Sequence, residues 1–174
     1  MKPWVSMAAA LLLAAALAGC GYHTAGHANQ LPADTRTIAI PAFVNRSQTY
    51  RIEQTLTEAV VREFVTRTTY HVENQPMPDA DLILKGTVDK TEFSPITYDS
   101  STGRASTALV TIHLKVSLVD RRGKVLYDNP SYLFRQQYQL SREASTFFEE
   151  SSPAMDRLSR DFAHTLVSNI LEAF

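Results

Sequence analysis

Residues 107–119 carry the clearest two-residue hydrophobic period in the chain. Apolar side chains occupy every second position, at Ala108, Val110, Ile112, Leu114, Val116 and Leu118, and alternate with Leu109, Thr111, His113, Lys115 and Ser117. This alternation predicts a strand with one face on a core and the other open to water or to a partner. At 3.3 Å per residue it would be about 40 Å long, well beyond a usual strand.

Shorter stretches of the same kind predict three more strands. Thr37–Pro41 is a β-branched run ended by proline, and Asp81–Phe93 alternates apolar and polar positions. Lys124–Leu140 follows a tight turn at Asp120–Gly123 and carries alternating aromatic positions, with an interruption near Asn129-Pro130. A glycine in the turn supplies the positive φ that a hairpin requires.

Two segments have helical rather than strand periodicity. Apolar residues fall at three- and four-residue steps from Tyr50 to Thr66, which predicts an amphipathic helix. Ser152-Pro153 has the pattern of an N-cap followed by proline at the first helical position. The apolar face after it, Met155 to Ile170, predicts a final helix of about twenty residues, roughly 30 Å long.

Two polar stretches show neither the two-residue period of a strand nor the three- to four-residue period of a helix. His71–Pro78 is predicted to be a connector, and Pro95–Ala105 is predicted to be an exposed loop. The resulting order, β-α-β-β-β-α, predicts an α+β fold with two helices packed on one face of a four-stranded mixed sheet. The first two strands should be joined by a right-handed parallel crossover, and the last three should form an antiparallel meander.

The first nineteen residues are predicted to be a signal peptide. Met7–Leu17 is an unbroken apolar run about half as long as the roughly 20 residues that a membrane span needs. Leu17-Ala18-Gly19-Cys20 looks like a bacterial lipobox, which makes Cys20 the predicted lipidation site. Resemblance to bacterial lipoproteins implies a diacylglyceryl thioether and an N-acyl chain on this cysteine. These three acyl chains would anchor the protein permanently, since burial contributes about 0.8 kcal/mol per CH₂.

The residue after Cys20 indicates which of the two membranes the lipoprotein is anchored in. Gly21 stands where an aspartate would retain a lipoprotein in the inner membrane, so we expect the periplasmic face of the outer membrane. Residues 20–35 are small and polar and suit a tether. Residues 36–174 would then form a single α+β domain.

Composition narrows the possible functions. Hydrophobic residues make up 44% of the 174 residues, which is enough for a core, and 17 basic against 18 acidic residues give no excess charge for binding nucleic acid. One cysteine permits no intrachain disulfide and no thiolate zinc cage. His23 and His27 lie four apart but have no third ligand nearby, so no metal is expected.

No catalytic constellation is recognisable. His71, His113 and His164 have no fixed spacing to an acid, and there is neither a glycine-rich phosphate loop nor a Gly-x-Ser-x-Gly elbow. We therefore predict no catalytic residues, no cofactor and no enzymatic activity.

Several short motifs together resemble the LPS-assembly lipoprotein (LptE) family. They are Cys20-Gly21-Tyr22-His23, Leu31-Pro32, the run from Thr37 to Asn45, Ala80-Asp81-Leu82, the 107–119 strand and the carboxy-terminal helix. The resemblance implies two helices on a four-stranded sheet. It also implies a plug and assembly partner of an LptD-like β-barrel translocon, which assists delivery of lipopolysaccharide to the cell surface.

Lipopolysaccharide carries phosphates and acidic sugars, which basic side chains can bind through charge-assisted hydrogen bonds. The candidates are the turn residues Arg121, Arg122 and Lys124, together with Arg104 and Lys115. The alternative is that these charges only keep the hairpin soluble. In the 95–105 segment, Tyr98 and Ser101 are candidate contacts with the barrel.

Two other classes of function stay open. Ile40-Pro41-x-Phe43-x-Asn45 also resembles lipid-anchored activators or scaffolds of envelope machines, such as penicillin-binding-protein activators and curli-secretion lipoproteins. An envelope enzyme using His113 or His164 is the third possibility.

Overall fold

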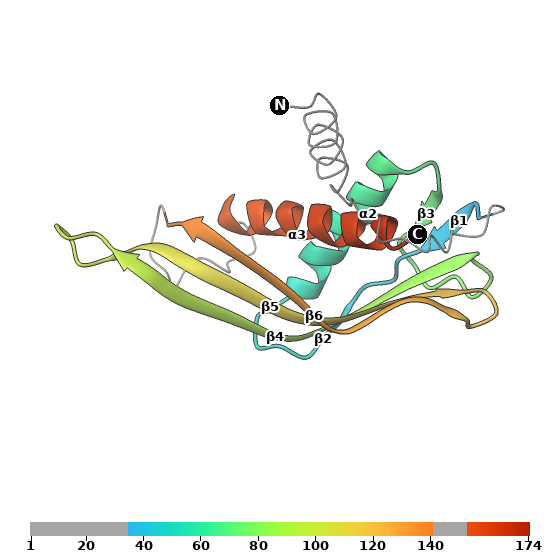
Figure 1. The fold of residues 1–174 in the computed structure, drawn as a ribbon, viewed down its shortest axis with the longest axis horizontal. Coiled ribbons are helices and arrows are strands. Elements are labelled where there is room, and N and C mark those ends of the chain that lie inside the picture. Colours follow the sequence, from blue (N-terminus) through green and yellow to red (C-terminus); the bar gives the residue numbers. More distant parts are fainter. Residues whose placement is uncertain (1–34, 141–152) are drawn as a thin grey trace, which may run out of the picture.

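A computed structural model describes residues 35–140 and 153–174 (Figure 1). The elements follow the order β1 (Thr37–Ala39), β2 (Val44–Asn45), α2 (Ile52–Arg67), β3 (His71–Glu73), β4 (Leu82–Tyr98), β5 (Ala105–Asp120), β6 (Val125–Gln139) and α3 (Pro153–Glu172). The fold is α+β, as predicted, and both helices lie on the same side of the sheet.

Within the described residues, the sheet has six strands where the sequence predicted four. Its order is β3-β1-β4-β5-β6, and the short β2 pairs with β4 farther along. The β1 strand is parallel to β3 and β4, and β2 is parallel to β4. The long strands β4, β5 and β6 are antiparallel, so the predicted parallel pairing and the predicted meander are both confirmed.

The predicted connector at His71–Pro78 is wrong in its first three residues, which form β3. Their pairing with β1 is short, and the Ile40 N–H extends it by donating to the Glu73 carbonyl (2.7 Å). Because β3 is an outer strand with half-buried or exposed side chains, it lacks the apolar alternation that identifies a strand in a sequence.

The predicted loop at Pro95–Ala105 is also wrong over much of its length. The β4 strand continues to Tyr98 and β5 begins at Ala105, so only residues 99–104 turn. Proline is tolerated at position 95 because no described strand pairs with the outer side of β4 there, and the missing N–H leaves no ladder bond unmade. The interruption expected near Asn129-Pro130 is a register shift within one continuous β6.

One face of the sheet and both helices share a hydrophobic core. The alternate positions of β5 from Ala108 to Leu118 are all at most 1% exposed, as their period predicts. Phe162 of α3 packs edge-on against Phe134 of β6, with ring centroids 5.6 Å apart. The Tyr138 hydroxyl also donates to Asp161 (3.0 Å), which fastens α3 to the same strand.

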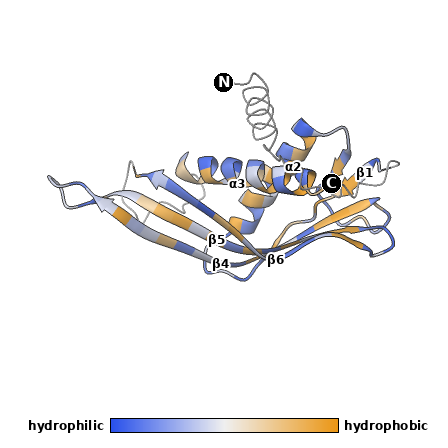
Figure 2. Ribbon diagram, viewed as in Figure 1, coloured by the Kyte–Doolittle hydropathy of each residue, from blue (hydrophilic) through white to orange (hydrophobic). Residues whose placement is uncertain are grey.

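The opposite face of the sheet is largely open, as predicted. Lys115 is exposed, and Leu109, His113 and Ser117 are half-buried. Thr111 is an exception at 4% exposure, because it lies on the central strand with Glu92 and Arg135 as its direct neighbours in register. The far end of the β4–β5 hairpin projects well beyond the helices, while the strongly hydrophobic start of β4 lies at the opposite end (Figures 1 and 2).

Candidate functional site

The β5–β6 turn presents two of its three basic candidates to solvent. The Asp120 carboxylate accepts hydrogen bonds from the N–H groups of Arg122 and Lys124, both at 2.8 Å. Gly123, at φ +80°, completes the turn. These bonds fix the backbone, and within the described residues neither Arg122 nor Lys124 forms an ion pair. Both cations are therefore available to a ligand.

Arg121 has a different role from its two neighbours. Its guanidinium forms an ion pair with Asp81, whose other carboxylate oxygen accepts the N–H groups of Arg36 (2.9 Å) and Thr37 (3.0 Å). These backbone hydrogen bonds, followed by the one from Arg121, hold the pKa of Asp81 well below its usual range. Asp81 therefore joins the β5–β6 turn to the start of β1, and Arg121 is a structural residue of that junction.

Lys115 lies in the middle of the open face. Its ammonium is 3.1 Å from Asp89, at the point where β4 has a register shift, and β6 has a shift on the other side of β5. The two irregularities border a shallow hollow of about 330 Å³ that His113 and Ser131 also line. Carboxylates offset the positive charge here, since Lys90 forms an ion pair with Glu92 and lowers the pKa of that side chain.

The two candidate barrel contacts lie at the tip of the β4–β5 hairpin, where several hydrogen bonds converge on one carboxylate. Tyr98 is 63% exposed, and Ser101 lies at the turn itself. One oxygen of Asp99 accepts the N–H groups of Ser101 (2.9 Å) and Thr102 (2.8 Å) and both of their hydroxyls. These hydrogen bonds, the one from the Ser101 hydroxyl foremost, lower the pKa of Asp99 to about 2.

The five basic candidates do not form one site. Arg104 follows the tip turn, Lys115 lies mid-strand, and Arg121, Arg122 and Lys124 lie at the other end of β5. At 3.3 Å per residue, the sixteen residues of β5 separate the two ends by about 50 Å. Any ligand contacts at the tip and at the β5–β6 turn are therefore contacts of separate surfaces.

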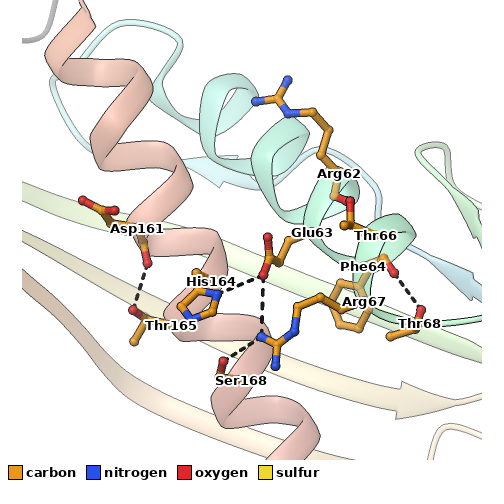
Figure 3. Close-up of polar contacts among 10 residues, drawn as sticks. All are labelled: Arg62, Glu63, Phe64, Thr66, Arg67, Thr68, Asp161, His164, Thr165 and Ser168. Carbon is orange, nitrogen blue, oxygen red and sulfur yellow. Dashed lines mark hydrogen bonds and ion pairs between the residues drawn. The ribbon is translucent and has the colours of Figure 1, made fainter.

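The histidines considered for catalysis also lie apart. Figure 3 shows His164 of α3 beside Glu63 of α2, with Nδ1 3.1 Å from the carboxylate, and Arg67 donating to Ser168 (2.7 Å). His71 pairs with Glu73, and His113 lies on the open face of the sheet. Among residues 35–140 and 153–174, no three His, Cys, Asp or Glu side chains gather where they could hold a metal.

Sequence reasoning assigned no structural role to Asp99, which holds the tip turn, or to Asp81, which joins the β5–β6 turn to β1. Asp99 precedes Ser-Ser-Thr-Gly, a typical signal of a turn in which an aspartate bonds its own following backbone. Asp81 offers no such local signal, because its partners are about forty positions away along the chain. Cys20, His23 and His27 lie outside the described residues. No helix within those residues is long and apolar enough to span a bilayer.

The fold has counterparts among solved structures. The PelC dodecamer from Paraburkholderia phytofirmans shares 12% identity over 83% of this chain and 93% of its own, with a TM-score of 0.52. The hypothetical protein CT253 from Chlamydia trachomatis shares 10% identity over 79% and 96%, with a TM-score of 0.52. Rare lipoprotein B from Shewanella oneidensis shares 15% identity over 74% and 92%, with a TM-score of 0.45. At such identities the first two matches indicate a common fold only.

The sequence itself gives the more specific result. No curated protein matches the chain significantly. The profile of the LptE family, described as lipopolysaccharide-assembly, matches residues 35–173, which include every helix and strand of the structure. The chain therefore belongs to the LptE family, as its motifs predicted.

Proposed function

We propose that the protein is a lipid-anchored plug and assembly partner of an LptD-like β-barrel in the outer membrane, where it assists delivery of lipopolysaccharide to the cell surface. The observation that carries the proposal is family membership over residues 35–173. The anchor would be the acylated Cys20, on the periplasmic face of the membrane. Residues 36–174 would act as one domain, by shape and by ligand contact, without catalysis.

The long hairpin supports a role inside a pore. It presents Tyr98 and the turn around Ser101 beyond the helices, on a tip that hydrogen bonds to Asp99 keep in one conformation. A fixed conformation lowers the entropy lost on binding, which favours insertion into a confined lumen. The tip would therefore contact the barrel.

The first experiment tests the barrel partner. The full-length protein, carrying a photo-crosslinking residue at Tyr98 or Ser101, should capture a large β-barrel protein in cells and co-purify with it in detergent. Val65, exposed on α2 on the helical side of the molecule, is the matched control position. Capture of a penicillin-binding synthase or a ring of identical subunits would favour the alternative envelope machines, and absence of a barrel would overturn the plug.

The second experiment tests the anchor. Cys20→Ser should release the protein from membranes, because a sulfur for the thioether-linked lipid is then missing. Persistence of the variant in the membrane fraction without a barrel partner would contradict the proposed localisation.

The third experiment tests lipopolysaccharide binding at the β5–β6 turn. Replacing Arg122 and Lys124 by Gln should weaken binding in a salt-dependent way, because screening acts on exposed charge pairs. Arg121 stays in place so that the Asp81 junction is preserved. The control is Arg62→Gln with Arg160→Gln, the same loss of charge on the helices. Unchanged lipopolysaccharide binding in the turn variant would show that this turn is not part of the ligand site. Its charges would then only keep the hairpin soluble.

A further inference from the structure

The long antiparallel strands β4, β5 and β6 have two free edges, on β4 and on β6, and these edges differ in how well they are protected against pairing with another strand. Beyond Val88, the free edge of β4 carries Lys90, Pro95 and register shifts at three places. Each of these features hinders pairing with another strand. The free edge of β6 is regular over Tyr132–Gln139, which pairs with β5 without a shift. That stretch contains no proline and a single charged residue, Arg135.

The hydrogen-bonding groups of this edge can be assigned. The Leu140 N–H donates to the Ser106 carbonyl of β5 (2.9 Å). Backbone N–H groups alternate in direction along a strand, so the N–H groups of the odd-numbered residues of this stretch point away from β5. These residues are Leu133, Arg135, Gln137 and Gln139. Within the described ranges no strand lies on that side of β6. The edge is thus a template for one more antiparallel strand.

We propose that the β6 edge pairs with the β6 edge of a second copy of this chain. The stretch is self-complementary, because Gln136, Gln137 and Gln139 carry side-chain amides that both donate and accept. If Gln136 faces its own copy, Arg135 faces Gln137 and Leu133 faces Gln139. The outward amides then form about eight main-chain hydrogen bonds.

Charge and side-chain packing select that register over its neighbours. Centring the pair on Arg135 would place two guanidinium groups opposite each other, which is unfavourable. Centring it on Gln137 would leave Leu133 beyond the regular stretch. With Gln136 at the centre, Phe134 faces Tyr138 on the helix-covered side, and aromatic cross-strand pairs of this kind stabilise a sheet.

Single cysteines distinguish the possible registers. In the full-length protein in detergent, Gln136→Cys should form a disulfide-linked dimer under mild oxidation, since directly opposed residues of a non-hydrogen-bonded pair come close enough for a disulfide. Arg135→Cys and Gln137→Cys report the two neighbouring registers and should link weakly. Ser94→Cys, exposed on β4, and the unaltered chain are controls that should form no disulfide-linked dimer.

A second measurement does not depend on thiols. Sedimentation equilibrium of the unaltered protein should give a mass rising from one toward two chains with concentration. Gln137→Pro removes an outward N–H and should hold the mass at one chain while circular dichroism stays unchanged. The proposal is overturned by a mass of one chain at all concentrations, by equal crosslinking of Ser94→Cys, or by a Gln136 crosslink only to a different protein. Barrel co-purification is scored separately, so either idea can fail alone.

Discussion

The helix-covered part of the sheet and the projecting tip of the β4–β5 hairpin are built from the same two strands and are held by different forces. Beneath the helices, Leu114, Val116 and Leu118 are each 1% exposed. At the tip, every residue from Ser94 to Arg104 is exposed. Burial of apolar surface stabilises the first region, whereas strand pairing and the Asp99 hydrogen bonds stabilise the second.

Because of this difference, a substitution in the helix-covered core should destabilise the whole fold, whereas a substitution at the tip should have only a local effect. Core side chains of both helices and of the sheet belong to one buried cluster, so loss of one lowers the free energy of unfolding of the whole fold. A tip residue supports only the turn around it. Regions with few buried contacts open locally without global unfolding, so the tip can be altered at little cost to the rest of the fold.

The largest expected effect is that of Phe162→Ala. Phe162 is fully buried and meets the rings of Phe134 and Tyr132 edge-on. Removing it should lower the free energy of unfolding by about 3–5 kcal/mol, measured by urea denaturation with circular dichroism. His164→Ala, on the exposed side of the same helix, should cost less than about 1 kcal/mol. Similar losses in both variants would contradict the assigned core.

The next largest effect should come from Gly86→Ala. A Cβ built on Gly86 would lie 2.6 Å from the Phe43 ring, which covers this glycine of β4. The clash should cost about 1–3 kcal/mol of unfolding free energy. Combining it with Phe43→Leu should cost less than the sum of the two single changes, because the smaller side chain relieves the clash. Strict additivity would show that the two residues do not touch.

The long elements were predictable because their hydrophobic periods are sustained over many residues. The β5 alternation and the faces of α2 and α3 depend only on which side meets the core, and a sequence records this directly. The short strands β2 and β3 were not predictable. A stretch of two or three residues is too short to show a period, and its pairing depends on where β1 and β4 already lie.

The candidate site was predictable in its residue types and not in its arrangement. Basic residues near turns are visible in a sequence, but the separation of Arg104 from Arg122 follows from the length of β5. The ion pair between Arg121 and Asp81 joins residues forty positions apart, so only the folded chain distinguishes Arg121 from Arg122. Where bonds are local, as at Asp99, the sequence does carry the signal.

A smaller effect is expected for Asp81→Ala, at the end of the sheet opposite the tip. The change removes the acceptor of the Arg36 and Thr37 N–H groups and the partner of Arg121. Hydrogen exchange at these two amides should become faster, with a drop in melting temperature smaller than that of Gly86→Ala. Arg121→Gln should reproduce only part of the change, because the backbone bonds remain. Equal effects would mean that the ion pair, rather than the backbone bonds, holds the junction.

The smallest global effect and the most local one should follow protonation of Asp99. Its folded-state pKa of about 2 lies below the usual value of an aspartate, so its ionised form contributes stability that is complete above about pH 4 and is lost as the pH falls toward 2. In that window the Ser101 and Thr102 amides should exchange faster, while the amides of Val116 and Leu118 stay protected. Asp99→Asn should show the fast tip exchange at neutral pH and abolish its acid dependence, because the amide side chain does not titrate. Exchange that rises equally at the tip and in the core would mean that acid unfolds the whole sheet, and the tip would then not be an independent local unit.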